Sequence, residues 1–195
     1  MWELLPTKVK YWIGIGGAIF LFVIFEKLLG QSFLRAISYT ITTMTILAWL
    51  FGKYLWRYVY FDILKRKFCP DFNGEWVGKI SSNFGGGTTV EFPIKIEADF
   101  FNVKMLGSTT LGRTYANYCK IVRTEDGCFE LEYMFKGIND TPSETDATFY
   151  EGAARLRVID ISTMNMKGVY WTNRCWQQSK NTAGVIELVK KCIDI

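Results

Sequence analysis

Two uncharged apolar stretches near the N-terminus constrain this chain more than any other feature. They cover Tyr11–Phe25 and Ala36–Gly52, and only the segment Glu26–Arg35 separates them. After Cys69 the chain consists of short segments in which apolar and polar residues alternate, which is the period of half-buried β-strands. The sequence therefore predicts a mixed fold: a transmembrane two-helix hairpin with a basic stalk over residues 1–68, followed by an all-β domain over residues 69–195.

The ends of the two stretches carry residues that a membrane interface favours. Each stretch is shorter than the ~20 residues that span a hydrocarbon core, but flanking lysine and arginine side chains can extend to the interface. Two alternatives remain open: buried helices of a soluble domain, and a cleaved signal peptide at the first stretch. Neither stretch has a polar face, and Glu26 and Lys27 follow the first without a small-residue cleavage site. The aromatic residues at the ends, typical of an interfacial belt, are Trp2, Tyr11, Trp12, Tyr54, Trp56, Tyr58 and Tyr60.

Basic residues around the hairpin predict its orientation. Lys8 and Lys10 precede the first stretch and five basic residues follow the second, whereas the segment between them holds only Lys27 and Arg35. Basic residues favour the cytoplasmic side of a membrane. We therefore expect both termini, and with them the β domain, in the cytoplasm.

Charge and rare residue types exclude several functions. The chain has a formal charge of +4, but residues 1–68 carry nine Lys/Arg against three Asp/Glu, whereas residues 69–195 carry fourteen against sixteen. The β domain therefore lacks the basic field that binds long nucleic acid.

The chain contains no histidine, which excludes histidine-based catalytic triads and histidine-containing zinc sites. Its five cysteines show no CxxC spacing, so we expect reduced thiols rather than disulfides or a metal site.

The alternating segments predict about eight strands, the clearest of which runs over Val90–Ala98. Eight short strands with close turns predict a meander closed into a barrel, or a two-sheet sandwich. Turns are expected at Asn83–Gly87, Gly107–Gly112, Glu125–Gly127, Asn139–Asp146 and Asn173–Thr182. The other expected strands lie around Glu75–Ser82, Phe101–Met105, Tyr115–Arg123, Phe129–Phe135, Ala154–Val158, Met166–Trp171 and Val185–Lys191.

The segment Gly74-Glu75-Trp76 resembles the G-x-W motif of lipocalin-like barrels. In those barrels the tryptophan closes one end and a basic residue packs over it. The resemblance implies a lipocalin-like barrel, and Arg174 is a candidate for that basic residue. The alternative is an ordinary core tryptophan. An eight-stranded barrel has room for packed side chains or for one small ligand.

A late segment combines residue types that bind nucleotides. Tyr170, Thr172 and Arg174 alternate within Gly168–Arg174, so a strand there would place all three on one face. Aromatic faces stack on bases, and a guanidinium can bind phosphate through two hydrogen bonds. The alternative is half-buried barrel aromatics and solvated arginines. Further candidate ligand-binding residues, which form similar pairs, are Arg113, Tyr115, Arg155 and Arg157.

The chain resembles a known family in four features. These are the two predicted transmembrane helices, the β domain that follows them directly, the early G-x-W motif and the late segment Gly168–Arg174. This is the family of two-transmembrane, β-strand-rich effectors that accompany cyclic-nucleotide synthases in bacterial antiphage (CBASS) operons. The resemblance covers the whole chain in architecture and includes no catalytic signature. It implies a cytoplasmic barrel that binds a cyclic dinucleotide. Binding would drive self-association in the lipid bilayer of the inner membrane and disrupt it, with no enzymatic activity, cofactor or metal.

Two other functions remain open. A membrane-tethered lipocalin-like carrier or sensor of a lipid or apolar small molecule would share the G-x-W motif and the apolar strand faces. A membrane enzyme has less support. Its carboxylate pair Glu130/Glu132 lies on the outer face of an amphipathic strand, and the chain has no histidine to act with it.

Overall fold

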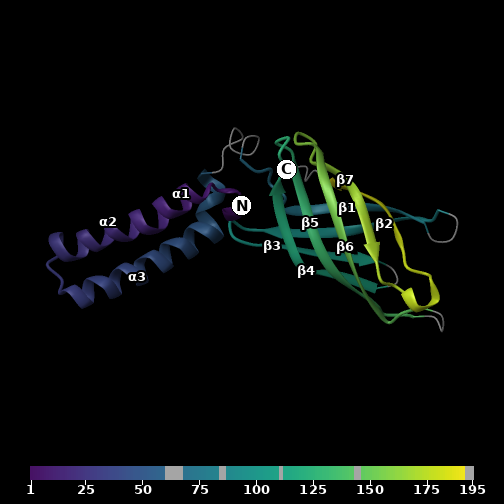
Figure 1. Ribbon diagram of the computed structural model, residues 1–195, viewed down its shortest axis with the longest axis horizontal. Helices are drawn as coiled ribbons and strands as arrows, with labels where there is room; N and C mark the ends of the chain where they lie inside the picture. Colours follow the sequence, from purple (N-terminus) through teal and green to yellow (C-terminus); the bar gives the residue numbers. More distant parts are fainter. Residues whose placement is uncertain (60–67, 84–86, 110–111, 143–145, 192–195) are drawn as a thin grey trace. The chain divides into compact units, whose positions relative to one another are not determined.

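The chain divides into two compact units (Figure 1). One contains Met1–Leu64 together with Asp99–Phe101, and the other contains Lys65–Ala98 and Asn102–Ile195. The structure is a computed structural model and describes all residues except 60–67, 84–86, 110–111, 143–145 and 192–195. The expected boundary between residues 68 and 69, and the end of the basic stalk, stay predictions because residues 60–67 lie outside the described part.

The first unit contains a hairpin of two apolar helices. The most apolar 18-residue window has a mean hydropathy of 1.6 in Thr7–Leu28 and of 1.3 in Phe33–Tyr58, and both helices are long enough to cross a membrane. Each is longer than its uncharged stretch, because the helix continues through the flanking residues. The helical elements, after the 3-10 turn η1 (Trp2–Leu4), are α1 (Thr7–Tyr11), the π-helical turn η2 (Trp12–Gly16), α2 (Gly17–Val23), the π-helical turn η3 (Ile24–Leu28), α3 (Phe33–Leu50), the π-helical turn η4 (Phe51–Leu55) and α4 (Trp56–Val59).

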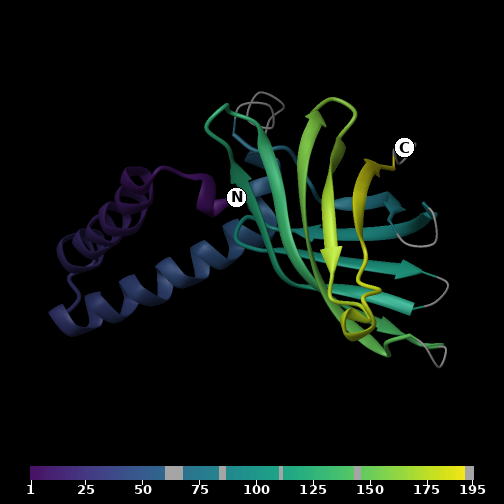
Figure 2. The same ribbon diagram turned by 45° about the vertical axis from the view of Figure 1, so that its right-hand side comes forward.

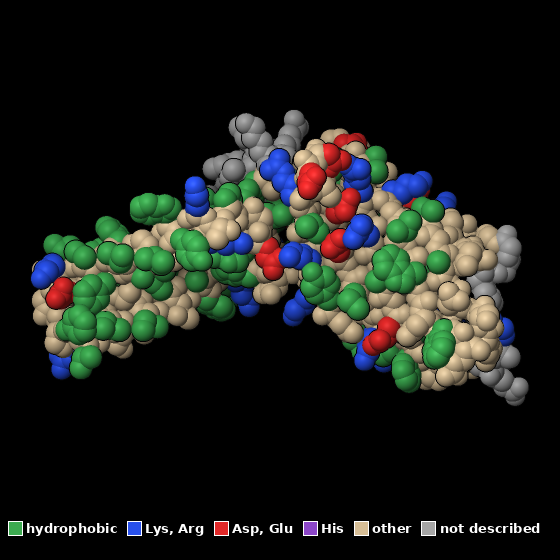
Figure 3. Space-filling view, in the orientation of Figure 1, with side chains coloured by type: hydrophobic (Ala, Val, Ile, Leu, Met, Phe, Trp, Pro, Cys, Tyr) green, Lys and Arg blue, Asp and Glu red, His purple; other side chains and the backbone are tan. Residues whose placement is uncertain are grey.

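Apolar side chains cover the outside of the hairpin (Figure 3). Trp12 and Leu34 are each 78% exposed, and no residue of α1 or α2 is buried. The two helices contact each other through small and aromatic side chains, such as Gly17 against Met44 and the rings of Phe22 and Phe33 at 5.6 Å. Exposure of large apolar side chains on this scale fits contact with lipid and does not fit the core of a soluble domain.

The second unit is a closed antiparallel barrel (Figure 2). Each strand pairs with the next along the chain, and β8 pairs with β1 to close the cylinder. The expected meander barrel is therefore confirmed, and the sandwich alternative is not. The strands are β1 (Gly74–Ser82), β2 (Thr89–Ala98), β3 (Val103–Thr109), β4 (Gly112–Arg123), β5 (Phe129–Asn139), β6 (Phe149–Asp160), β7 (Asn165–Thr172) and β8 (Ala183–Lys190).

The predicted bounds of the turn at Gly107–Gly112 were wrong at both ends. Gly107 lies inside β3 and Gly112 begins β4, while residues 110–111 lie outside the described part. The glycine at 107 serves close packing rather than a turn. A Cβ there would come within 2.5 Å of the Thr114 hydroxyl on the neighbouring strand. Glycine inside a strand commonly marks such an approach.

A bulge in β4 changes which side chains point inward. The pairing register with β5 shifts between Ala116 and Tyr118. Because side chains alternate along a strand, one extra residue moves the later ones to the opposite face. The half-buried Ala116 before the bulge and the buried Ile121 after it both face the interior. Tyr115 and Tyr118, on either side of the bulge, are therefore both exposed.

Trp76 closes one end of the barrel, as the G-x-W resemblance implied. It is fully buried, its indole donates a hydrogen bond to the Phe72 carbonyl at 3.0 Å, and its ring stacks on that of Phe72. The Lys190 Nζ lies 5.9 Å from the indole centroid and donates to the Asp71 carbonyl at 2.8 Å. The cation over the tryptophan is therefore Lys190. The alternative role of Arg174, packing over Trp76, is excluded, because Arg174 follows β7 at the opposite end.

The glycine of the motif has a structural reason. Gly74 has φ = +138°, a backbone conformation that residues with a Cβ rarely adopt. A Cβ at this position would also approach the Lys190 Cε to 3.0 Å. Gly74 thus allows the chain to turn into β1 directly beneath the lysine that covers Trp76.

Substitution of Trp76 tests this closure. Because Trp76 is fully buried, Trp76→Ala should remove about 3–5 kcal/mol from the free energy of unfolding. Trp176→Ala is the matched control: Trp176 is 64% exposed, so its loss should change stability by less than about 0.5 kcal/mol. Chemical denaturation of the full chain in detergent, followed by circular dichroism, measures both. Equal stability of the two variants would contradict the closure.

Candidate functional site

The barrel contains a cavity at the end opposite Trp76. Its volume is about 540 Å³, within the range of roughly 300–1,000 Å³ typical of small-molecule sites. Residues next to the β1–β2, β3–β4, β5–β6 and β7–β8 connections line its mouth. With one end filled by Trp76, the opposite half of the barrel is the part with space for a ligand.

The deep part of the cavity is apolar and uncharged. Phe92, Ile94, Met105 and Ile186 are buried there, together with Tyr133. Burial raises the pKa of the Tyr133 hydroxyl, so this group is neutral at pH 7. An apolar group or the aromatic face of a ring fits such a lining better than a phosphate does.

An ion pair between two connections forms one side of the mouth. Arg174, just after β7, donates from Nε to Asp146 Oδ1 at 2.8 Å and from Nη2 to Asp146 Oδ2. Asp146 lies shortly before β6 and also accepts a hydrogen bond from the Asn139 amide at 2.8 Å. The hydrogen bond with Arg174 is the main cause that lowers the Asp146 pKa and raises the Arg174 pKa. Both groups are therefore ionised at pH 7.

An aromatic ring supports the guanidinium of this pair. The Arg174 Cζ lies 5.1 Å from the centroid of the Tyr150 ring, a cation–π distance. Tyr150 in turn lies against Gly137, its pairing partner on β5, where a Cβ would come within 2.3 Å of the ring. Glycine at 137 thus allows Tyr150 to lie flat against the wall. The ring and the carboxylate together fix the arginine at the mouth.

Hydroxyl groups continue the polar lining beside Arg174. The Thr172 and Thr182 hydroxyls are 2.7 Å apart, and the Arg174 backbone N–H donates to the Thr172 hydroxyl at 3.3 Å. Tyr170 is buried on the same face of β7 as Thr172. Burial raises the Tyr170 pKa, opposed by hydrogen bonds with Ser82 and Thr182. Its hydroxyl therefore remains protonated and can act as a donor.

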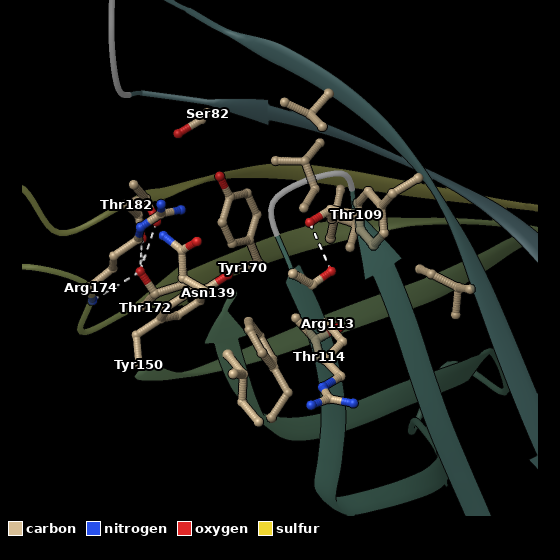
Figure 4. A pocket seen from close by; sticks show the side chains of 18 of the residues that line it. Ser82, Thr109, Arg113, Thr114, Asn139, Tyr150, Tyr170, Thr172, Arg174 and Thr182 are labelled. Carbon is tan, nitrogen blue, oxygen red and sulfur yellow. Dashed lines mark hydrogen bonds between the residues drawn. The ribbon is translucent and has the colours of Figure 1, made fainter. Parts of the chain in front are cut away.

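A second polar group lies across Tyr170 from the first (Figure 4). Thr109 ends β3, and Thr114 and Arg113 lie near the start of β4. Arg113 borders the cavity, but alternation along β4 puts its side chain on the outward face that Tyr115 also occupies. The mouth therefore presents hydroxyl groups on two sides, with Arg174 on one of them and Tyr170 between them.

The structure brings together four of the seven residues expected to bind a ligand: Tyr170, Thr172, Arg174 and Arg113 all line the cavity. The other three lie on the outer face of the barrel. Tyr115 is exposed, Arg155 Nε is 2.9 Å from Glu132 Oε1, and Arg157 pairs with Asp126. These three are not part of the candidate site.

Sequence reasoning missed several residues of the mouth. Asp146 lies in an expected turn, where an acidic residue is normally solvated, so no local pattern marks it. Tyr150 could have been found, because the alternation that places Ala154 inside the barrel continues back through Gly152 to Tyr150. Asn139 was assigned to a turn and instead ends β5, buried.

These observations define a class of protein: an apolar helical hairpin joined to a closed β-barrel with a ligand-sized cavity. No family model matches the chain. CD-NTase-associated protein 15 of Escherichia albertii is 68% identical to it over 191 residues, which make up 98% of each chain. The chain therefore belongs to the family of this protein, which is the two-transmembrane, β-strand-rich CBASS family expected from the sequence.

The lowered pKa of Asp146 makes a prediction about stability. A depressed carboxyl pKa stabilises the folded state above the ordinary pKa of 3.8 and ceases to do so as the pH falls through the folded value. The thermal midpoint of Asp146→Asn should therefore lie below that of the parent protein at pH 7, and the difference should shrink below pH 3.8. Glu151→Gln removes an exposed carboxylate paired to Lys136 at 3.6 Å and is the control. A pH-independent difference for Asp146→Asn would contradict the ion pair.

Proposed function

We propose that this protein is a membrane-anchored antiphage effector whose barrel binds a cyclic dinucleotide in the cavity described above. Binding drives self-association in the bacterial inner membrane, which then loses its integrity. The observation that carries the proposal is the composition of the cavity: an apolar depth beneath a mouth with hydroxyl groups on two sides and Arg174 on one of them.

The chemistry of a cyclic dinucleotide matches this composition. The molecule has two phosphates and two bases joined in a ring. Guanidinium and hydroxyl groups bind phosphate, and the mouth offers Arg174 with Thr172 and Thr182 on one side and Thr109 with Thr114 on the other. Tyr170, between them, suits the face of a base. These contacts to phosphate are local, so the absence of a basic field on residues 69–195 is compatible with this ligand.

The comparison with known proteins supports the same ligand class. The relative from E. albertii is named for its association with a CD-NTase, and the family resembles effectors that accompany cyclic-nucleotide synthases. The proposed response is physical rather than chemical. Lateral association of anchored barrels requires no catalytic residue, and two helices for each chain are too few to line a pore without further copies. The protein is accordingly proposed not to be an enzyme.

Arg174→Ala tests the proposed site. Loss of a charge-assisted phosphate contact costs about 1.5–3 kcal/mol, which is roughly a 10- to 150-fold loss of affinity. Calorimetry on the full chain in detergent, with cyclic di-AMP, cyclic di-GMP, cyclic di-UMP and cyclic GMP–AMP as probes, measures it. Arg155→Ala is the matched control, because Arg155 lies on the outer face, paired to Glu132. It should bind as the parent protein does.

Two results would overturn this assignment. If a folded Arg174→Ala protein binds a probe as tightly as the parent protein, Arg174 is not a ligand contact. If no cyclic dinucleotide binds, while a fatty acid or an apolar dye does, the protein is instead a lipocalin-like carrier or sensor. The apolar depth formed around Phe92, Ile94 and Met105 is the observation that favours this second candidate.

The proposed cytoplasmic site of ligand binding requires a particular topology. The basic residues Lys8, Lys10 and Lys53, together with Arg57, flank the helices on the side of the termini, so both termini should face the cytoplasm. Alkaline phosphatase, active only in the periplasm, should be inactive when fused behind the barrel. The same enzyme inserted between Leu29 and Ser32, at the other end of the hairpin, should be active. The reverse pattern would place the barrel outside the cytoplasm.

A further inference from the structure

We propose that Asp146 is a positioning residue of the binding site: it holds the Arg174 guanidinium in the orientation that receives a phosphate. This inference rests on the proposed function and concerns a residue that does not itself contact the ligand. Asp146 is acidic and lies at the mouth of a site proposed for a dianion, so its charge alone would weaken binding. Its presence therefore needs another explanation.

The contacts of Asp146 argue against a direct role with the ligand. Oδ1 accepts hydrogen bonds from Arg174 Nε at 2.8 Å, from the Ala147 backbone N–H at 2.8 Å and from the Cys175 thiol at 3.6 Å. Oδ2 accepts from Arg174 Nη2 and from the Asn139 amide at 2.8 Å. Two carboxylate oxygens offer about four acceptor positions, and five donors already occupy them.

The contacts of Arg174 show what Asp146 does instead. A guanidinium has five N–H donors, and Asp146 uses two of them on one edge. Tyr150 covers one face of the guanidinium. Carboxylate and ring together fix the plane of the group, and among the described residues the remaining donors have no other hydrogen-bond partner. The Arg174 side chain keeps 28% of its surface exposed, which leaves access for a phosphate.

The positions of Asp146 and Arg174 in the chain explain why ordering the arginine before the ligand arrives would favour binding. Asp146 belongs to the β5–β6 connection and Arg174 to the β7–β8 connection, so neither has the rigidity of a strand. A long side chain that is ordered only when the ligand arrives loses rotamer freedom at that moment, which weakens binding. The ion pair orders Arg174 in advance. The affinity gained by ordering Arg174 in advance must exceed the affinity lost through repulsion between Asp146 and the ligand. Whether removal of the Asp146 carboxylate weakens or strengthens binding therefore tests the proposal.

Two Asp146 variants separate geometry from charge. Asp146→Asn keeps the shape and removes the charge, whereas Asp146→Glu keeps the charge and displaces the carboxylate by one methylene. Both should bind the cyclic dinucleotide that the parent protein prefers about 2- to 12-fold more weakly, the effect of immobilising one flexible side chain. Glu151→Gln removes a carboxylate from the outer face of β6 and should leave affinity unchanged. Circular dichroism confirms that each variant is folded in detergent.

A double variant shows whether Asp146 acts through Arg174. If it does, Arg174→Ala/Asp146→Asn should bind no more weakly than Arg174→Ala alone, because nothing remains to be positioned. A purely structural role would add a further loss in the double variant and overturn the inference. Unchanged or tighter binding by folded Asp146→Asn and Asp146→Glu, with Arg174→Ala still weakened, would also overturn it and leave the proposed function intact. Failure of the parent protein to bind any of the four probes would instead overturn the proposed function, and this inference with it.

Discussion

Burial of Trp76 determines where this barrel can hold a ligand. The indole fills the end at which β1 begins, Phe72 stacks on it and Lys190 covers it. An eight-stranded barrel has an interior only wide enough for side chains or one small molecule. Filling one end therefore confines the free volume to the other. Arg174 and its polar contacts lie at that other end, beside the cavity.

The site combines two kinds of structure. The walls are strands whose pairing leaves little freedom, and they supply the apolar depth around Phe92 and Tyr133. The mouth consists of residues beside hairpin connections, which are less constrained. Packing between strands supports the mouth at one point: Gly137 gives space to Tyr150, and the Tyr150 ring lies beneath Arg174. The absence of a side chain at Gly137 in the barrel wall thus determines where the Arg174 guanidinium lies.

Much of the fold followed from periodicity, and most of the site did not. The uncharged stretches predicted both helices, and alternation predicted all eight strands, because burial of one face imposes a regular pattern on the sequence. The G-x-W segment predicted a closed end, but not that Lys190 covers it, because that contact joins residues far apart in the chain. Alternation placed Tyr170 and Thr172 correctly inside. It could not find Asp146, whose role depends on a connection with no periodic pattern, nor show that Arg155 and Arg157 are used by acidic neighbours on the outer face.

The separation between walls and mouth also affects how such a protein can change over evolutionary time. The residues that pair β5 with β6 and β7 with β8 fix the register of the cylinder, whereas Asp146 and Arg174 lie outside those ladders. A hairpin connection can gain, lose or exchange residues without shifting the strands that it joins. Under the proposed function, a change in the molecule that is recognised would therefore require only a few substitutions at one rim, and the pairing of the strands would not have to change.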